Sequence, residues 1–192
     1  MSDYYEHASQ VDLAKPVILC GYLSEFTRGV AYRASALLGL PFHDIERLVE
    51  HEIGQDIGKL LLEEGEPAYR EVEELCLGRA LRDEPYGLVA LGDGGLLNAD
   101  SLERVLGQGQ LVVLDLDLPN LYWRAQKLTR TNETSDWHPL YEGSPTSVDE
   151  IRPFYQERRS GFERADLRVD ANIAGKEQAC DQLIRWIQVF GA

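Results

Sequence analysis

The sequence predicts an α/β fold in which helices cover both faces of a five-stranded parallel sheet. Short runs rich in Val, Ile and Leu alternate with segments of helical periodicity, which is typical of such a sheet. The chain has 192 residues, of which 44% are hydrophobic, enough for one domain with a sizeable core. We therefore expect a single domain over residues 13–192, preceded by a disordered N-terminus over residues 1–12. The five predicted strands are Pro16–Cys20, Pro41–Asp44, Gly87–Leu91, Leu111–Asp115 and Leu167–Asp170.

A candidate phosphate-binding loop follows the first strand. Gly21 opens a turn and an amphipathic helix continues to about Leu38, so the chain has the strand–loop–helix order of a P-loop. A working P-loop reads G-x-x-x-x-G-K-[ST], because its backbone wraps a phosphate, its Lys reaches the β and γ oxygens, and its hydroxyl holds Mg²⁺. In Gly21-Tyr-Leu-Ser-Glu-Phe-Thr-Arg28, Phe, Thr and Arg replace the second Gly, the Lys and the Ser/Thr. Ordinary ATP binding is not expected at this degenerate nucleotide loop, whose candidate residues are Gly21, Ser24, Thr27 and Arg28.

A glycine-rich turn and a polar segment are further candidate functional regions. Gly92-Asp-Gly-Gly95 follows the third predicted strand at its carboxyl end, where open α/β sheets bind ligands. The same glycines could simply form a turn. Residues 127–147 are polar and rich in helix breakers, so we expect a mobile loop there. The segment Gly175–Phe190 has apolar residues at helical spacing and is predicted to close the fold as a helix.

Charge and composition argue against several classes of function. The chain has 33 acidic and 19 basic residues and a formal net charge of −14, which disfavours binding to nucleic acid. No apolar run approaches the ~20 residues that span a bilayer, and the N-terminus is acidic rather than signal-like, so we expect a cytoplasmic protein without a membrane partner. Cys20, Cys76 and Cys180 lie in apolar segments without metal-ligand spacing, which indicates buried thiols in a reducing compartment.

Several motifs carry a resemblance to one enzyme family. Leu40-Pro-Phe-His-Asp-Ile-Glu46 is similar to an F-x-D-x-D motif, and the run Ile53–Arg70 ends like a G-E-x-x-F-R motif. Leu88–Gly95 stands in the place of an A-T-G-G-G turn, with Asp93 at the middle Gly. These motifs, with the loop after the first strand, are those of the shikimate kinases, which the chain resembles.

The resemblance continues towards the C-terminus. Trp137-His-Pro-Leu140 occupies the place of the family's R-P-L-L lid motif, and the segment from Tyr155 to Asp166 is similar to its last R-x-x-x-Y segment. Together the matching segments cover roughly residues 16–190. The resemblance implies the family's three-layer fold, a P-loop nucleoside/shikimate kinase-like fold with a lid at about residues 127–147.

The resemblance also implies which residues form the site. Arg70 would grip the carboxylate of a substrate, and Glu46 would bind its hydroxyl groups. Asp44 has the family's metal-binding position, but no metal is expected because position 28 has no hydroxyl to share it. The implied substrate-binding residues are Glu46, Arg70, Gly92, Asp93, Gly94 and Arg158, and the implied lid residues are Arg124, Arg130 and His138, the last in place of an Arg.

Each of these residues has a purely structural alternative. Arg70 could pair with acidic residues of its own helix. Glu46 could be a solvated acid at a helix N-terminus, which Asp44 could cap. Arg158 lies in a Glu-Arg-Arg cluster that is typical of a solvated face, and His138 could be an exposed residue of the lid.

Two functions remain open on the sequence alone. The chain lacks the P-loop Lys, the Mg²⁺ hydroxyl and a lid Arg, and losing one such preorganised charge typically costs ~10²–10³ in rate. We therefore expect a non-catalytic protein without a cofactor, which binds a small carboxylate or a partner protein. The alternative is a divergent but active kinase that uses ATP and Mg²⁺ to phosphorylate shikimate or a related hydroxy acid. Arg28, Arg124 or Arg130 would then replace the lost groups.

Overall fold

The structure, a computed structural model, describes residues 11–131, 145–173 and 175–190, with side chains described outside residues 128–131. Five strands form one parallel sheet in the order β2-β3-β1-β4-β5. The predicted α/β fold with a five-stranded parallel sheet is confirmed. The strands are β1 (Val17–Gly21), β2 (Phe42–Asp44), β3 (Leu88–Ala90), β4 (Gln110–Asp115) and β5 (Leu167–Asp170). The helices are α1 (Ser24–Leu38), α2 (Ile45–Ile53), α3 (Ile57–Glu64), α4 (Glu66–Ala80), α5 (Ala99–Gln108), α6 (Leu118–Thr131), α7 (Val148–Phe162) and α8 (Lys176–Phe190).

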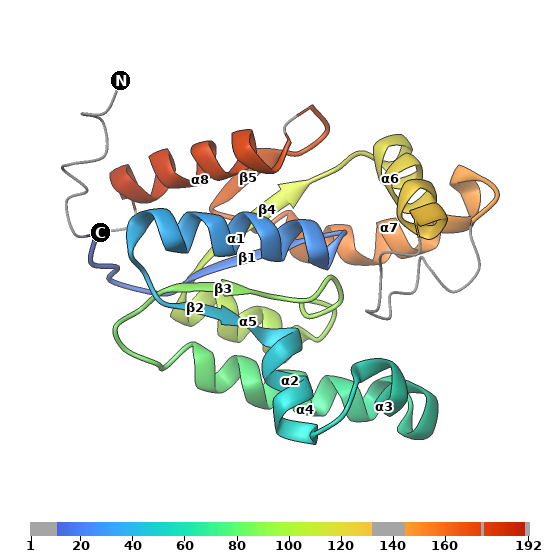
Figure 1. The fold of residues 1–192 in the computed structure, drawn as a ribbon, viewed down its shortest axis with the longest axis horizontal. Helices are drawn as coiled ribbons and strands as arrows, with labels where there is room; N and C mark the ends of the chain where they lie inside the picture. The colour runs from blue at the N-terminus through green and yellow to red at the C-terminus, as the bar shows by residue number, and fades with distance from the viewer. Residues whose placement is uncertain (1–10, 132–144, 174, 191–192) are drawn as a thin grey trace.

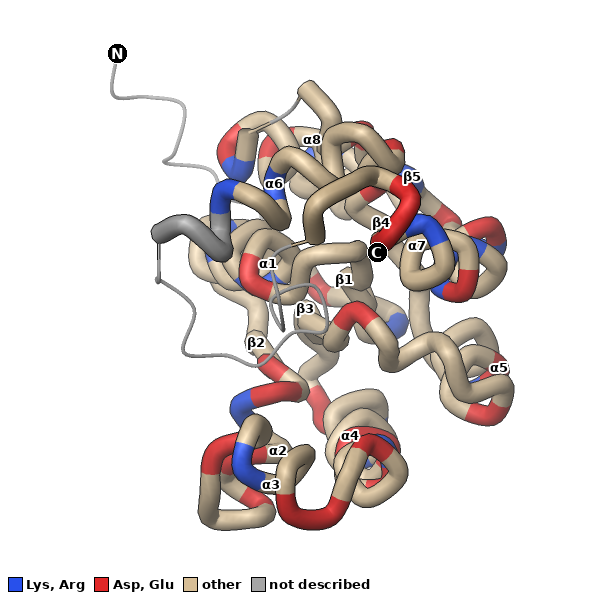
Figure 2. The backbone as a smooth tube through the Cα atoms, turned by 90° about the vertical axis from the view of Figure 1, so that its right-hand side faces the viewer, with Lys and Arg blue, Asp and Glu red and all other residues tan. Residues whose placement is uncertain are grey.

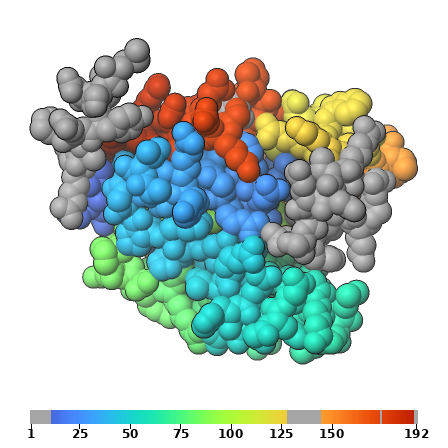
Figure 3. Space-filling view, in the orientation of Figure 1, coloured from blue at the N-terminus to red at the C-terminus, as the bar shows by residue number. Residues whose placement is uncertain are grey.

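Helices cover both faces of the sheet, so the fold has three layers (Figure 1). Helix α1 packs against α8 on one face, and α5 and α7 lie on the other (Figure 2). Helices α2, α3 and α4 pack against one another beyond the β2 edge. In the space-filling view the surface of α2 adjoins that of α1, and α3 follows beside α2 (Figure 3). The α2–α4 group is therefore continuous with the rest of the domain.

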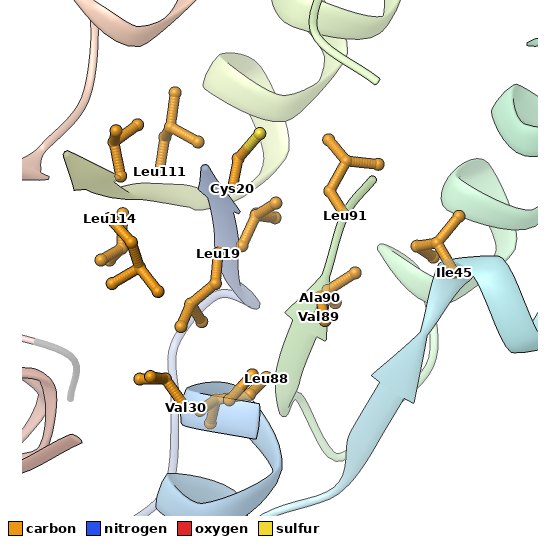
Figure 4. Close-up of a cluster of buried hydrophobic side chains, with 14 of the residues drawn as sticks. Leu19, Cys20, Val30, Ile45, Leu88, Val89, Ala90, Leu91, Leu111 and Leu114 are labelled. Atoms are coloured by element: carbon orange, nitrogen blue, oxygen red, sulfur yellow. The ribbon is translucent and has the colours of Figure 1, made fainter. Parts of the chain in front are cut away.

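The core explains why these apolar runs become strands. Every residue of β1 is buried, and its side chains alternate between the two faces of the sheet. Figure 4 shows Leu19 and Cys20 of β1 among side chains of β3 and β4, with Val30 of α1 and Ile45 of α2 beside them. A strand whose side chains are apolar on both faces of the sheet is stable only if helices cover both faces. The helical segments between the strands provide this cover.

Strand order places three connections at one edge of the sheet. From β1 the chain crosses to β2 and β3, which lie on one side of β1 in the sheet. It then crosses to β4 and β5 on the other side, so the direction of winding reverses beside β1. Because the sheet is parallel, the turns after β1, β2 and β3 lie together at its carboxyl edge. This is the position at which open α/β sheets bind ligands.

Several predicted boundaries need correction. Residues 127–131 belong to α6 and not to the expected loop, because Gln126-Lys-Leu-Thr-Arg130 contains good helix formers and no Gly or Pro. Val11, expected to be disordered, packs against the core because its apolar side chain is partly buried there. The remaining predictions, which concern residues 1–10 and 132–144 and include the one for His138, lie outside the described residues. Among the described helices, none combines the length and the apolar character that a membrane span requires.

Candidate functional site

The connection between β1 and α1 is much shorter than the sequence predicts. Helix α1 begins at Ser24, so Tyr22 and Leu23 alone separate it from β1. The expected loop Gly21–Arg28 is therefore wrong over its second half, which is helical. Phe26 has a helix-compatible side chain where a Gly would have let the backbone open around a phosphate. Two residues cannot supply the run of backbone N–H groups that surrounds a phosphate in a P-loop.

Side chains of this connection are engaged with the protein itself. Thr27 is buried, and its Oγ1 donates a hydrogen bond to the carbonyl oxygen of Leu23, 3.1 Å away. A Cβ at Gly21 would lie 3.0 Å from the same Oγ1. The hydroxyl that stands at the position of the missing Lys is thus used to close the first turn of α1.

Aromatic contacts hold the connection against α7. Tyr22 is buried and stacks on Tyr155, with ring centroids 4.7 Å apart, and it meets the edge of Phe162 at 4.9 Å. On α1, the ring of Phe26 lies 4.8 Å from the guanidinium carbon of Arg124, a lid residue implied by the resemblance. Aromatic pairs of this kind contribute ~0.5–1.5 kcal/mol beyond their buried area. The connection is therefore held from two sides.

Arg124 has a further partner at the carboxyl edge of the sheet. Its Nη2 donates a hydrogen bond to the carbonyl oxygen of Ala171. The side chain is consequently placed between α1 and the end of β5. The side chain of Arg130 and the residue His138 lie outside the described part of the chain.

Arg28 points towards the start of α2. Its Nη1 lies 3.5 Å from Oδ2 of Asp44 and 3.8 Å from Oε2 of Glu46. Asp44 is also the N-cap of α2, where its side chain accepts a hydrogen bond from the backbone N–H of Arg47. The alternative that Asp44 caps the helix is confirmed. Burial raises the pKa of Asp44, and Arg28 opposes that rise.

Glu46 is largely buried in the site, with 16% of its side chain exposed, and is not a solvated helix-start acid. Burial raises the pKa of Glu46 to about 8, and the charges of Asp93 and Asp44 act in the same direction. Arg28 and a hydrogen bond with Ser24 oppose the shift. A carboxyl group with this pKa is partly protonated near neutral pH, so it can donate a hydrogen bond as well as accept one.

Arg70 is paired with acidic residues of its own helix, which was its structural alternative, and its predicted role in holding a substrate carboxylate stays a prediction. Its Nε and Nη2 bind Glu66, and its Nη1 donates to Oε2 of Glu73 at 2.7 Å. The guanidinium also lies against the glycine turn, because a Cβ at Gly94 would collide with it. Arg70 is therefore paired within α4 and still faces the carboxyl edge of the sheet.

Sequence reasoning missed Glu73 and Tyr69 as residues of the site. Glu73 is 3% exposed and accepts a second hydrogen bond from the hydroxyl of Tyr69, 3.1 Å away. A Cβ at Gly92 would lie within 3.5 Å of Glu73, Glu46 and Tyr69 side-chain oxygens. The i,i+3 spacing of Arg70 and Glu73 was the available signal.

Arg158 is buried, contrary to the solvated-cluster alternative. It is 5% exposed, and its Nε donates to Oδ2 of Asp93 at 2.8 Å. Its guanidinium carbon lies 3.5 Å from the centre of the Phe154 ring. Asp93 is itself 8% exposed, so the pair is shielded from water on both sides. Breaking a buried pair by removing one partner typically costs ~3–5 kcal/mol.

These side chains leave a small cavity at the carboxyl edge of the sheet. Its enclosed part has a volume of about 20 Å³, room for about one water molecule, and the pocket continues outward to solvent. Acidic side chains outnumber the arginines around it, and Figure 2, which looks onto this edge, shows acidic positions at the start of α2 and between α3 and α4. The lining residues are Arg28, Glu46, Glu50, Asp56, Ile57, Tyr69, Arg70 and Asp93.

The structure thus brings most of the predicted site together. Glu46, Arg70 and Asp93 line the cavity, and Arg158 is joined to it through Asp93. Cys20, Cys76 and Cys180 are buried, unpaired thiols, as expected; burial raises the pKa of each.

Comparison with known proteins identifies a family. The family model described as shikimate kinase matches residues 29–188, beginning directly after Arg28. The shikimate kinase of Caulobacter vibrioides is 31% identical over 176 residues, covering 86% of this chain and 84% of the relative. That of Salinibacter ruber is 33% identical over 163 residues, covering 81% and 76%.

Solved structures show the same fold. A shikimate kinase from Acinetobacter baumannii in complex with shikimate superimposes with a TM-score of 0.79 at 18% identity, covering 95% of this chain and 97% of that one. The shikimate kinase from Aquifex aeolicus gives 0.71 at 22% identity, covering 92% and 99%.

Proposed function

Since the chain belongs to the shikimate kinase family, we propose that it binds a small hydroxylated ligand in the family's pocket without transferring a phosphoryl group from ATP. The observation that carries the proposal is the two-residue connection between β1 and α1. Phosphoryl transfer depends on positioning and on charges around the β- and γ-phosphates, most of which a P-loop supplies. The observed connection lacks the loop that would position the phosphates, and it lacks the Lys that would supply a positive charge beside them.

The residues present do not fit ATP with Mg²⁺. The hydroxyl of Thr27 is bonded to Leu23, and Asp44 is engaged with α2 and Arg28. Among the described residues, no group of three or more His, Cys, Asp and Glu side chains is arranged to hold a metal ion. We therefore assign no catalytic step to ATP or to Mg²⁺ in this chain.

The other candidate function is a divergent but active kinase, and the comparisons favour it. The relatives that match this chain are named shikimate kinases. Activity would require Arg28 to leave Asp44 and Glu46, and Arg124 to leave Ala171, to reach a nucleotide. Each departure would leave a partner without its hydrogen bond or counter-ion, which opposes this function. A role in binding a partner protein also remains a proposal.

An assay of the purified chain separates the two functions. We expect no ADP formation from ATP·Mg²⁺ and shikimate above a protein-free control, and no heat of nucleotide binding in calorimetry. The methyl ester of shikimate, which keeps the ring hydroxyls, is expected to bind. A nucleotide-dependent rise in melting temperature that disappears in Arg28→Ala but persists in Arg33→Ala would contradict the proposal. Arg33 is the matched control, because it lies on α1 and pairs with exposed Glu177.

A further inference from the structure

Asp93 is a charged residue inside a buried glycine turn. Gly92, Gly94 and Gly95 surround it, and the whole turn is buried at the carboxyl edge of the sheet. A buried carboxylate is unfavourable unless a counter-ion and hydrogen bonds compensate it. The compensating group is the guanidinium of Arg158, which comes from α7, 65 residues along the chain.

The contact has the geometry by which an Arg holds a ligand's carboxylate. Nε of Arg158 donates to Oδ2 of Asp93 at 2.8 Å, within the range of charge-assisted hydrogen bonds. Phe154 stacks under the guanidinium and fixes its plane. An arginine held in this way would be a preorganised anion-binding group, and here the anion is part of the chain.

Arg70 does not offer an unoccupied alternative. Nη1 is bound to the buried Glu73, whereas Nε and Nη2 are bound to Glu66, which is half exposed. Every nitrogen of the Arg70 guanidinium is therefore engaged by a carboxylate of its own helix. The buried pair of Arg158 and Asp93 is consequently the contact that decides whether a further carboxylate can be held.

We propose that Asp93 determines ligand specificity as a built-in carboxylate that occupies Arg158, so the pocket takes a small hydroxylated ligand that has no carboxylate. The inference deepens the proposed function and rests on it. A ligand carboxylate would have to displace Asp93 from Arg158 in a buried site. It would also approach Glu46, Glu50 and Asp56, which line the same cavity. Hydroxyl groups, in contrast, donate to carboxylate oxygens and match this lining.

The sequence predicted a small carboxylate ligand for this chain, and that prediction is untested. The present proposal differs from it, because it limits carboxylate binding to a variant in which Arg158 is released. Asp93→Gly restores a turn of four glycines and removes the internal anion. Asp93→Asn removes the charge and keeps the side-chain size, which covers the case in which the glycine variant does not fold.

The experiment compares shikimate with its methyl ester, which differs in charge but keeps the ring and hydroxyls. By calorimetry, we expect the unaltered chain to bind the ester at least about tenfold more tightly than shikimate, and Asp93→Gly to reverse this order. Shikimate should raise the melting temperature of Asp93→Gly and leave that of the unaltered chain unchanged. Asp181→Asn is the control, since Asp181 is exposed on α8 and does not line the cavity, so this variant removes the same charge elsewhere on the chain.

Three outcomes would overturn the inference: tight shikimate binding by the unaltered chain, no gain in shikimate affinity in either Asp93 variant, or an equal gain in Asp181→Asn. The last result would mean that net charge, and not the contact with Arg158, sets the preference. None of these outcomes involves nucleotide, so they are distinct from ADP formation, which would contradict the proposed function instead.

Discussion

Arg28 of α1 lies with its Nη1 3.5 Å from Oδ2 of Asp44, the residue that ends β2 and caps α2. The contact joins the helix after the first strand to the helix after the second, across the edge at which the cavity opens. The same Nη1 lies 3.8 Å from Glu46. One guanidinium therefore faces two largely buried carboxyl groups, and this dual contact leads to the first prediction.

Arg28→Ala should destabilise the fold. Asp44 would lose its counter-ion, whereas Glu46 is mostly protonated at pH 7 and would lose little, so we expect the free energy of unfolding to fall by about 1–2 kcal/mol. Urea unfolding at pH 7 measures this change. Arg33→Ala, on the same helix, removes an exposed ion pair and should cost less than about 1 kcal/mol. Equal losses in the two variants would mean that helix propensity, not the buried contact, sets the effect.

The pH dependence of stability should report Glu46. Its pKa in the folded chain is raised to about 8, above the ordinary value of 4.5, so the folded state binds more protons than the unfolded state between these values. Its contribution to stability is therefore full below pH 4.5 and is lost as the pH rises towards 8. Asp44, Asp93 and Arg28 face Glu46 and set the size of the shift.

Glu46→Gln tests this assignment. The unaltered chain should lose stability relative to the variant by on the order of 1 kcal/mol per pH unit between pH 5 and pH 8. Urea unfolding of both proteins at several pH values gives the difference. Parallel curves would show that Glu46 ionises normally in the folded chain.

Gly94→Ala should be costly, because its Cβ would collide with the guanidinium of Arg70. Arg70 is flexible in itself but is held by Glu66 and Glu73, so it cannot withdraw without breaking those contacts. We expect a loss of about 1–3 kcal/mol in the free energy of unfolding. Gly107→Ala, in α5 with open space around it, should instead stabilise by ~0.5–1 kcal/mol. A stable Gly94→Ala would mean that Arg70 does not hold this position in solution.

The strands could be predicted from the sequence because apolar runs report burial on both faces of a sheet. Each predicted strand lies within two residues of the observed bounds, as for Leu167–Asp170, which matches the observed β5. The start of α1 was missed, because the spacing of a P-loop was imposed on a segment in which Ser24 and the residues after it form a helix. The resemblance carried no information on how short the connection is.

The candidate site was partly predictable. Arg70 and Glu46 followed from motifs, and both line the cavity. The pairing of Asp93 with Arg158 joins residues 65 positions apart, and neither local spacing nor charge patterning reveals such a contact. Composition suggested that Arg158 was solvated, whereas α7 turns it inward onto Phe154. Long-range pairing is the property that the sequence alone did not supply.

The last prediction concerns Arg70 and the buried carboxyl group of Glu73. Burial raises the pKa of Glu73, and Arg70 is the main opposing influence. In Arg70→Ala that opposition is lost, so the pKa of Glu73 rises further and the folded state holds a proton that the unfolded state releases. The penalty should therefore be small near pH 5 and grow as the pH rises, reaching ~3–5 kcal/mol when the carboxyl group would have to be buried unpaired.

Adding Glu73→Gln to Arg70→Ala should recover most of the loss at pH 8, because the amide needs no counter-ion and can still accept the hydrogen bond from Tyr69. Arg79→Ala, which removes an exposed pair with Glu52, should have little effect on stability at any pH. Urea unfolding at pH 5 and pH 8 compares the variants. If the double variant is as unstable at pH 8 as Arg70→Ala, the guanidinium stabilises the fold by its packing on the glycine turn and not by neutralising Glu73.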